Sequence, residues 1–208
     1  MIRKVCGMRE ADNIREVEAL GIDWMGFIFW AHSPRNVADK PEYLPERCKR
    51  VGVFVDAPAP FIREKAQEFG LDVIQLHGHE DESFVLQLRY EIPEGRCGRM
   101  MIVKAINVAC EEDLKQSARY EGLCDFFLFD TKAEKVGGNG KSFDWDILHN
   151  YKGATPFLLS GGIGPDDKER LRTFHHPQMA GIDLNSRFEI RPAVKDIHLL
   201  KSFLHEQD

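Results

Sequence analysis

Short apolar runs alternate along the chain with segments of mixed apolar and polar residues. The runs Trp24–Trp30 and Phe126–Phe129 are apolar at nearly every position, which is typical of strands that are buried on both faces. In the mixed segment Arg9–Leu20, apolar side chains recur at helical spacing, and Gly21 marks its end. The pattern of strand followed by helix repeats roughly eight times, at intervals of about 26 residues.

The repeat predicts a set of strands and a set of helices. The strands are expected over Ile2–Cys6, Trp24–Trp30, Val51–Val55, Val73–Leu76, Met100–Ile106, Phe126–Phe129, Pro156–Leu159 and Ala180–Leu184. The helices are expected over Arg9–Leu20, Pro41–Arg50, Pro60–Phe69, Asp81–Tyr90, Glu111–Tyr120, Trp145–Tyr151, Pro165–Phe174 and Val194–His205. The segment Pro41–Arg50 has a weak helical pattern, and Glu91–Arg99 has no readable pattern.

Apolar strands that alternate with helices indicate an α/β fold with a parallel sheet. Eight strand–helix units favour closure into a (β/α)8 TIM barrel, and we expect residues 1–208 to form this one domain. The alternative is a doubly wound open sheet. Because typical barrels are nearer to about 250 residues, the loops of this chain should be short.

Composition and charge exclude several classes of protein. The 208 residues carry a net charge of −6, and the basic residues are scattered, so we expect no nucleic-acid partner. No apolar run approaches the roughly 20 residues of a membrane span, and the first residues do not resemble a signal peptide. The five cysteines are odd in number and form no C-x-x-C motif, which favours the reducing cytoplasm over disulfides or a zinc site.

Chemically useful side chains follow the expected strands. In a closed barrel the carboxyl ends of all the strands face one mouth. These ends carry the thiol of Cys6, the guanidinium of Arg35, the imidazole of His77 and the carboxylate of Asp183. Taken singly, Cys6 fits a buried core position as well as a nucleophile or base. Arg35 can be a surface residue or a ligand of a carboxylate or phosphate, and His77 can be structural or functional.

The expected strand Phe126–Phe129 ends on a further carboxylate, Asp130. It is followed by charged residues and the glycine-rich segment Gly137–Gly140, after which Ser142 or Asp144 could cap a helix. A carboxylate at the end of a buried strand, beneath a flexible loop, is a typical catalytic position in parallel barrels. An aspartate that only caps a loop fits this pattern equally well.

Two turns of small residues are candidates for binding an anion. Ser160-Gly161-Gly162 precedes the helix expected from Pro165, and Asn185-Ser186-Arg187 follows the last strand. Backbone N–H groups of such turns bind phosphate at helix N-termini. The loops after strands seven and eight are the usual phosphate site of this fold. The glycines could also serve only to make tight turns.

Seven segments, in order along the chain, resemble the phosphoribosylanthranilate isomerase family. They are Lys4-Val5-Cys6-Gly7-Met8, Gly26-Phe27-Ile28-Phe29 with Ser33-Pro34-Arg35, Val51-Gly52-Val53-Phe54-Val55, Gln75-Leu76-His77-Gly78, Gly137-Gly138-Asn139-Gly140-Lys141-Ser142-Phe143-Asp144-Trp145, Leu159-Ser160-Gly161-Gly162 and Gly181-Ile182-Asp183-Leu184-Asn185-Ser186. The resemblance implies a (β/α)8 barrel that acts in tryptophan biosynthesis. The implied reaction is an Amadori rearrangement, which converts an aminoaldose phosphate, N-(5-phosphoribosyl)anthranilate, to the aminoketose 1-(2-carboxyphenylamino)-1-deoxyribulose 5-phosphate.

The resemblance also implies roles for residues. Asp130 is the general acid that opens the sugar ring, Cys6 is the general base that removes the C2 proton, and Arg35 holds the anthranilate carboxylate. The remaining substrate-binding residues are His77, Gly161, Gly162, Asp183, Asn185 and Ser186. The reaction needs neither a metal nor a redox cofactor, and the enzyme is expected to be a monomer or a homodimer.

The chain departs from the family pattern at two positions beside the expected phosphate site. Arg187 stands where a glycine is usual, and Ala193 replaces the glycine of a later Pro-Gly pair. Two other functions stay open at this point. The related aminoaldose isomerase of histidine biosynthesis uses a carboxylate where this chain has Cys6. A non-catalytic barrel that only binds a phosphorylated ligand would need neither Cys6 nor Asp130.

Overall fold

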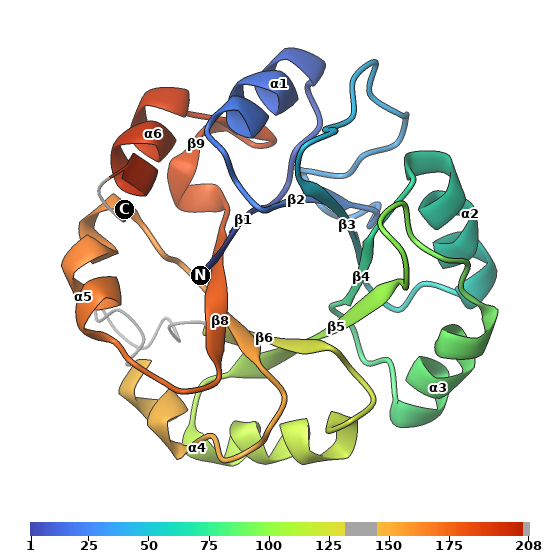
Figure 1. Ribbon diagram of the computed structural model, residues 1–208, viewed down its shortest axis with the longest axis vertical. Coiled ribbons are helices and arrows are strands. Elements are labelled where there is room, and N and C mark those ends of the chain that lie inside the picture. The colour runs from blue at the N-terminus through green and yellow to red at the C-terminus, as the bar shows by residue number, and fades with distance from the viewer. Residues whose placement is uncertain (132–144, 206–208) are drawn as a thin grey trace.

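Eight parallel strands close into a barrel in the computed structural model, which describes residues 1–131 and 145–205 (Figure 1). Each strand pairs with its neighbours in the sequence, and β1 also pairs with β8, with Lys4 opposite Asp183. The prediction of a closed (β/α)8 barrel is therefore confirmed. The strands are β1 (Ile2–Val5), β2 (Trp24–Ile28), β3 (Lys49–Phe54), β4 (Val73–Leu76), β5 (Met101–Val108), β6 (Phe126–Thr131), β7 (Phe157–Ser160) and β8 (Met179–Leu184).

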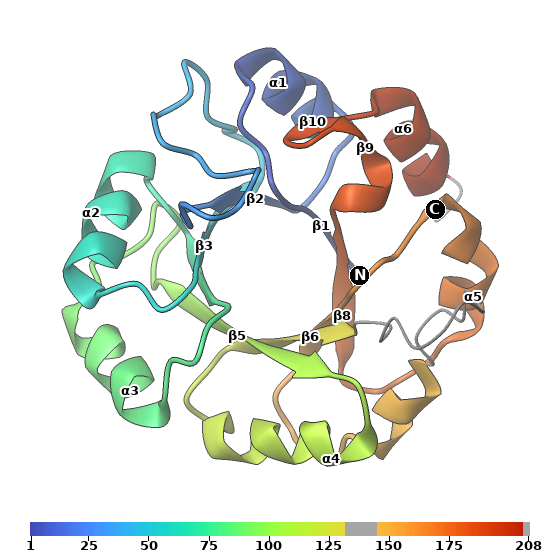
Figure 2. The same cartoon turned by 180° about the vertical axis from the view of Figure 1, so that it is seen from behind.

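The helices form a ring outside the strands, as both face-on views show (Figures 1 and 2). The α-helices are α1 (Ala11–Ala19), α2 (Ala59–Phe69), α3 (Glu82–Glu91), α4 (Glu111–Leu114), α5 (Lys168–Thr173) and α6 (Ile197–His205). The 3-10 helices are η1 (Lys115–Tyr120), η2 (Trp145–Asn150), η3 (Pro165–Asp167) and η4 (Ser186–Phe188). Several expected α-helices are thus partly or wholly 3-10 turns, which keeps the units of this barrel short.

Strand alternation divides the buried side chains into two layers. One set of positions fills the barrel interior with residues such as Val51, Val53, Leu128 and Leu158. The alternate positions pack outward against the helices, in a larger cluster that includes Phe127. Parallel strands that are apolar on both faces need both layers, which explains the continuous apolar runs of the sequence. Polar residues at interior positions therefore stand out as candidates for function.

The helix expected over Pro41–Arg50 is wrong, because this segment is irregular and β3 already begins at Lys49. Pro45 cannot donate a helical hydrogen bond, and its ring would clash with the preceding turn. The segment is instead held against α1 by the carboxylate of Glu18. That carboxylate accepts the backbone N–H groups of Glu46 and Arg47, both at 2.6 Å.

The last helix begins later than expected. Val194 and Lys195, which the sequence placed in a helix, form strand β10 (Val194–Lys195), which pairs antiparallel with β9 (Glu189–Arg191). The hairpin turn between them places Ala193 at φ 67°. Helix α6 then starts after Asp196, whose carboxylate accepts the N–H of Leu199 at 3.0 Å.

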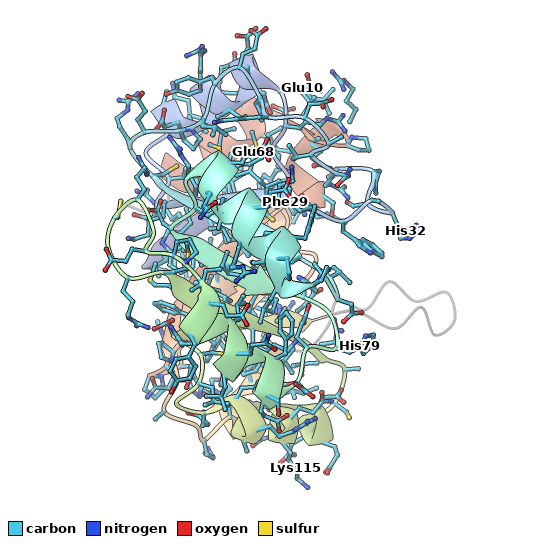
Figure 3. All side chains as sticks on the ribbon, turned by 90° about the vertical axis from the view of Figure 1, so that its right-hand side faces the viewer. Glu10, Phe29, His32, Glu68, His79 and Lys115 are labelled. Atoms are coloured by element: carbon cyan, nitrogen blue, oxygen red, sulfur yellow. The ribbon has the colours of Figure 1, made fainter. Side chains whose placement is uncertain are left out.

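The loops after the strands gather at one end of the barrel. In the side view, the segments that carry His32 and His79, which follow β2 and β4, lie on the same side of the molecule (Figure 3). The glycine-rich segment expected to cover Asp130, together with the capping positions 142 and 144, lies outside the described residues. Among residues 1–131 and 145–205, no helix is long and apolar enough to cross a membrane.

Candidate active site at the barrel mouth

Cys6 follows β1 directly and is almost completely buried, with 3% of its surface exposed. It packs with the interior cluster of the barrel, and its backbone N–H donates to the carbonyl of Leu184 at 2.9 Å. Gly26 on β2 makes room for it, because a Cβ at position 26 would lie 2.6 Å from the Cys6 sulfur. The thiol is thus held at the mouth against β2, while the backbone of Cys6 is bound to the end of β8.

Asp130 occupies an interior position near the end of β6 and contacts the imidazole that follows β4. His77 Nε2 lies 3.3 Å from Asp130 Oδ2, and His77 Nδ1 lies 3.0 Å from the side-chain nitrogen of Gln75. Gln75 is buried at 1% exposure. Its Oε1 accepts no hydrogen bond from the described part of the chain. The two sequence-predicted residues Asp130 and His77 are therefore brought together, with Gln75 beneath them.

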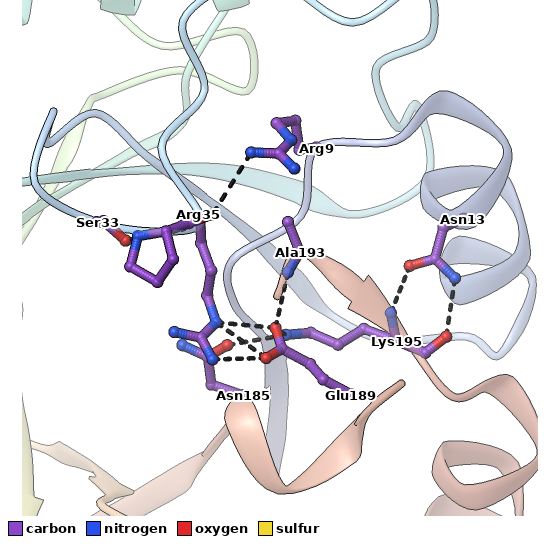
Figure 4. Close-up of polar contacts among 9 residues, drawn as sticks. Arg9, Asn13, Ser33, Arg35, Asn185, Glu189, Ala193 and Lys195 are labelled. Carbon is purple, nitrogen blue, oxygen red and sulfur yellow. Dashed lines mark hydrogen bonds and ion pairs between the residues drawn. The ribbon is translucent and has the colours of Figure 1, made fainter. Parts of the chain in front are cut away.

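Arg35 reaches back over the end of β1. Its side chain passes beside Gly7, where a Cβ would lie 2.7 Å from Arg35 Cδ, so this close approach needs a glycine. The guanidinium is bound by Glu189, with Nε 2.9 Å from Oε1 and Nη2 2.6 Å from Oε2. Lys195 Nζ lies 2.6 Å from Glu189 Oε1 and 2.8 Å from Asn185 Oδ1. Figure 4 shows both cations converging on Glu189.

Asp183 projects into the barrel from β8 and meets Lys4 on β1. Lys4 Nζ lies 2.9 Å from Asp183 Oδ1, and the lysine has no exposed surface. Ser160 Oγ, at the end of β7, donates to Asp183 Oδ2 at 3.4 Å. The predicted residue Asp183 is therefore fixed by a buried ion pair at the β1–β8 seam.

The two small-residue turns adjoin each other beyond β7 and β8. Gly161 and Gly162 have φ of 97° and 70°, a region that favours glycine. Ser186 opens the 3-10 turn η4, where Arg187 has no left-handed backbone. The Arg187 side chain folds back toward the loop that follows β7. A Cβ added to Gly164 in that loop would lie only 3.0 Å from Arg187 Nε. Arg187, at the position where the resemblance implies a glycine, is therefore accommodated without left-handed strain.

Burial and charge act in opposite directions on this site. Burial raises the pKa of the Cys6 thiol, and Asp183 adds to the rise, while the ammonium groups of Lys4 and Lys195 oppose it. Burial also disfavours the charged form of Glu189, but hydrogen bonds from Arg35 and Lys195 outweigh that effect and hold the pKa of this carboxyl below its ordinary value.

Sequence reasoning missed four side chains of this site: Lys4, Gln75, Glu189 and Lys195. Two of them could have been found from strand periodicity. Lys4 precedes Cys6 by two positions and Gln75 precedes His77 by two, so each shares the inward face of its strand. The positions of Glu189 and Lys195 depend on the β9–β10 hairpin, which the hydrophobic pattern of the sequence did not predict. Among the described residues, no group of three His, Cys, Asp or Glu side chains is arranged to hold a metal ion.

Comparison with known proteins covers nearly the whole chain. Residues 3–206 match the family model for N-(5'-phosphoribosyl)anthranilate (PRA) isomerase. The N-(5'-phosphoribosyl)anthranilate isomerase of Phocaeicola vulgatus is 50% identical over 206 residues, which cover 99% of this chain and 97% of that protein. The enzyme of the same name from Parabacteroides distasonis is 49% identical over 217 residues, covering 99% and 93%.

Solved structures agree with the sequence comparison. The phosphoribosyl anthranilate isomerase of Thermotoga maritima matches with a TM-score of 0.79 at 28% identity, covering 98% of this chain and 97% of that one. A crystal structure of such an isomerase in complex with reduced 1-(o-carboxyphenylamino)-1-deoxyribulose 5-phosphate matches with a TM-score of 0.78 at 26% identity, covering 98% and 97%. The chain therefore belongs to the N-(5'-phosphoribosyl)anthranilate isomerase family.

Proposed function

We propose that the protein converts N-(5-phosphoribosyl)anthranilate to 1-(2-carboxyphenylamino)-1-deoxyribulose 5-phosphate, with Asp130 as general acid and Cys6 as general base. The observation that carries the proposal is the placement of both groups at the mouth of one barrel in a chain of this family. The related isomerase in complex with a reduced form of the product supports the choice of substrate. A barrel that only bound a phosphorylated ligand would need neither group.

The reaction proceeds by proton transfers and needs no external oxidant: two of them use Asp130 and Cys6, and exchange with solvent afterwards restores both groups. Asp130 donates a proton to the ring oxygen of the sugar, the bond from C1 to this oxygen breaks, and a Schiff base forms between C1 and the anthranilate nitrogen. The Cys6 thiolate then takes the proton from C2, and the electron pair moves through C1 to the nitrogen. The resulting enolamine tautomerises to the ketone. Such acid–base groups typically contribute about 10²- to 10⁴-fold each.

The acid must hold its proton near neutral pH, where a free aspartic acid has lost it. We propose that His77 helps by accepting this proton as a hydrogen bond at Nε2, which requires the ring hydrogen on Nδ1. Gln75 would then turn its amide oxygen toward Nδ1–H. That orientation also gives a donor to Gln75 Oε1, the buried atom that otherwise lacks one among the described residues.

Arg35 and the two turns are proposed to bind the ends of the substrate. Glu189 occupies Nε and one terminal nitrogen of Arg35, so the anthranilate carboxylate is assigned to the side of the guanidinium that carries Nη1. The phosphate is assigned to backbone N–H groups at Gly162 and Ser186, in the turns after β7 and β8. Asn185 would act indirectly, through its contact with Lys195 at 2.8 Å.

The test follows the loss of substrate fluorescence with purified protein. Wild type should turn over, and Cys6→Ala and Asp130→Asn should each reduce kcat by at least about 100-fold while far-UV circular dichroism stays unchanged. Cys97→Ser is the matched control, because Cys97 is an exposed thiol and its loss should leave kcat unaffected. Near-normal kcat in either folded site variant removes that residue from its role. Absence of turnover in wild type overturns the assignment of substrate.

A further inference from the structure

The thiol of Cys6 has a buried ammonium group beside it. Lys4 and Cys6 are two positions apart, so both side chains point into the barrel. Lys4 has no exposed surface, and its Nζ is held 2.9 Å from Asp183 Oδ1 across the β1–β8 seam. The ammonium of Lys4 opposes the effect of burial on the pKa of the Cys6 thiol, so the two groups interact electrostatically. A fully buried lysine is rare unless it is paired, and Asp183 is the paired carboxylate here.

The charged groups around Cys6 come from three strands and one loop. Lys4 faces it from β1, Asp183 from β8, Lys195 from β10 and Arg35 from the loop after β2. Glu189 neutralises one of the latter two cations. These groups amount to three cations and two carboxylates, so one positive charge in this cluster has no described anion. A thiolate at Cys6 would balance it.

We propose that Lys4 is a positioning residue for the catalytic base: its ammonium, fixed by Asp183, donates a hydrogen bond to Cys6 and stabilises the thiolate form. The proposal rests on the function proposed above, because it explains how Cys6 becomes a base. Burial alone works against a thiolate, as it does at Cys48 and Cys124, whose pKa values it raises to about 12. At Cys6 the charge that opposes burial most strongly is the ammonium of Lys4, which shares the inward face of β1 with the thiol.

The test measures the thiol directly rather than turnover. In a Cys97→Ser, Cys110→Ser background, which removes the two exposed thiols, the rate of alkylation of Cys6 by iodoacetamide is followed against pH, with the site verified by mass spectrometry. Lys4→Met should shift the profile to higher pH by at least about one unit, which is a tenfold loss of thiolate at a given pH.

Asp183→Asn provides a control of opposite sign. It removes an anion beside the thiol, so the Cys6 profile should move to lower pH. A structural role for Lys4 would not produce two shifts in opposite directions. Lys4→Met leaves the carboxylate of Asp183 without its ion-pair partner, which can prevent folding. The double variant Lys4→Met, Asp183→Asn removes both charges and avoids this problem.

The alkylation profile of Cys6 in the double variant should still shift to higher pH, but by less than in Lys4→Met. The reason is that Lys4 has a larger effect on the Cys6 thiol than Asp183 has.

Two outcomes separate this proposal from the proposed function. An alkylation profile that is the same in wild type and in folded Lys4→Met overturns the role of Lys4, whatever the turnover. Absence of turnover on N-(5-phosphoribosyl)anthranilate, with the expected shifts intact, overturns the substrate but not the pairing of Lys4 with Cys6.

Discussion

Replacing Ala193 by glycine tests the strained turn that supports the site. Ala193 is completely buried at φ 67° in the β9–β10 hairpin, and its N–H donates to Glu189 Oε1 at 3.2 Å. The turn therefore aims a backbone donor at the carboxylate that holds Arg35 and Lys195. An L-residue in this region costs about 1–2 kcal/mol, which glycine does not incur.

The expected change in stability follows from three contributions. Removing the buried methyl group costs about 0.8 kcal/mol. The greater freedom of glycine in the unfolded chain costs about 0.4–1 kcal/mol. Relief of the left-handed backbone returns about 1–2 kcal/mol. Ala193→Gly should therefore leave the free energy of unfolding nearly unchanged.

The matched control is Ala66→Gly in α2. Ala66 is 3% exposed and lies in the helix interior, so the same atoms are removed from an unstrained backbone. The methyl and entropy costs remain, and the control should lose about 1.5 kcal/mol. Both variants are measured by equilibrium urea unfolding, followed by circular dichroism. Equal losses in the two variants would refute the argument that the hairpin turn stores strain.

Three further results are expected. Arg35→Lys should raise KM by about tenfold or more, because lysine lacks the planar fork; an unchanged KM places Arg35 outside the carboxylate site. Arg187→Gly should change kcat/KM by less than about tenfold, or about 1.4 kcal/mol, whereas a larger, salt-sensitive loss in KM alone would make its guanidinium a phosphate ligand. Because the folded-state pKa of Glu189 is lowered, its stabilisation is present above about pH 4.3 and lost as pH falls below it. The free energy of unfolding, measured with urea at pH values from 6 to 3, should therefore fall less steeply with decreasing pH in Glu189→Gln than in wild type. Parallel pH dependences of the two proteins would contradict this.

The sequence was sufficient for the barrel because most of the strands are apolar on both faces and several helices begin or end at a recognisable signal. The sequence wrongly predicted a helix over Pro41–Arg50, because a weak apolar pattern was given more weight than the two prolines of this segment. It also placed Val194 in the last helix, whereas this residue pairs with β9. Both errors concern segments whose structure is set by distant partners. In the first segment, the carboxylate of Glu18 accepts the backbone N–H of Glu46. In the second, the side-chain oxygen of Asn13 accepts the backbone N–H of Lys195.

The candidate site divides in a similar way. Cys6, His77 and Asp130 could be named from the sequence because they end strands whose boundaries were readable. The surrounding ion pairs could not, since Lys4 meets Asp183 and Arg35 meets Glu189 across separations of 179 and 154 residues. Local periodicity carries no information about which distant side chain will face a given position.

The seam between the first and last strands also affects how the enzyme is made. Cys6 is synthesised long before the groups that surround it on β8 and β10. A growing chain that has already formed its first six strands contains both Cys6 and Asp130, but neither Asp183 nor Lys195. The environment of the thiol is completed only by contacts of very high sequence separation, which join β1 to β8 and to the β9–β10 hairpin. Translation intermediates that already contain the proposed acid and base, but not yet β8 and β10, therefore lack the charges that surround the proposed base.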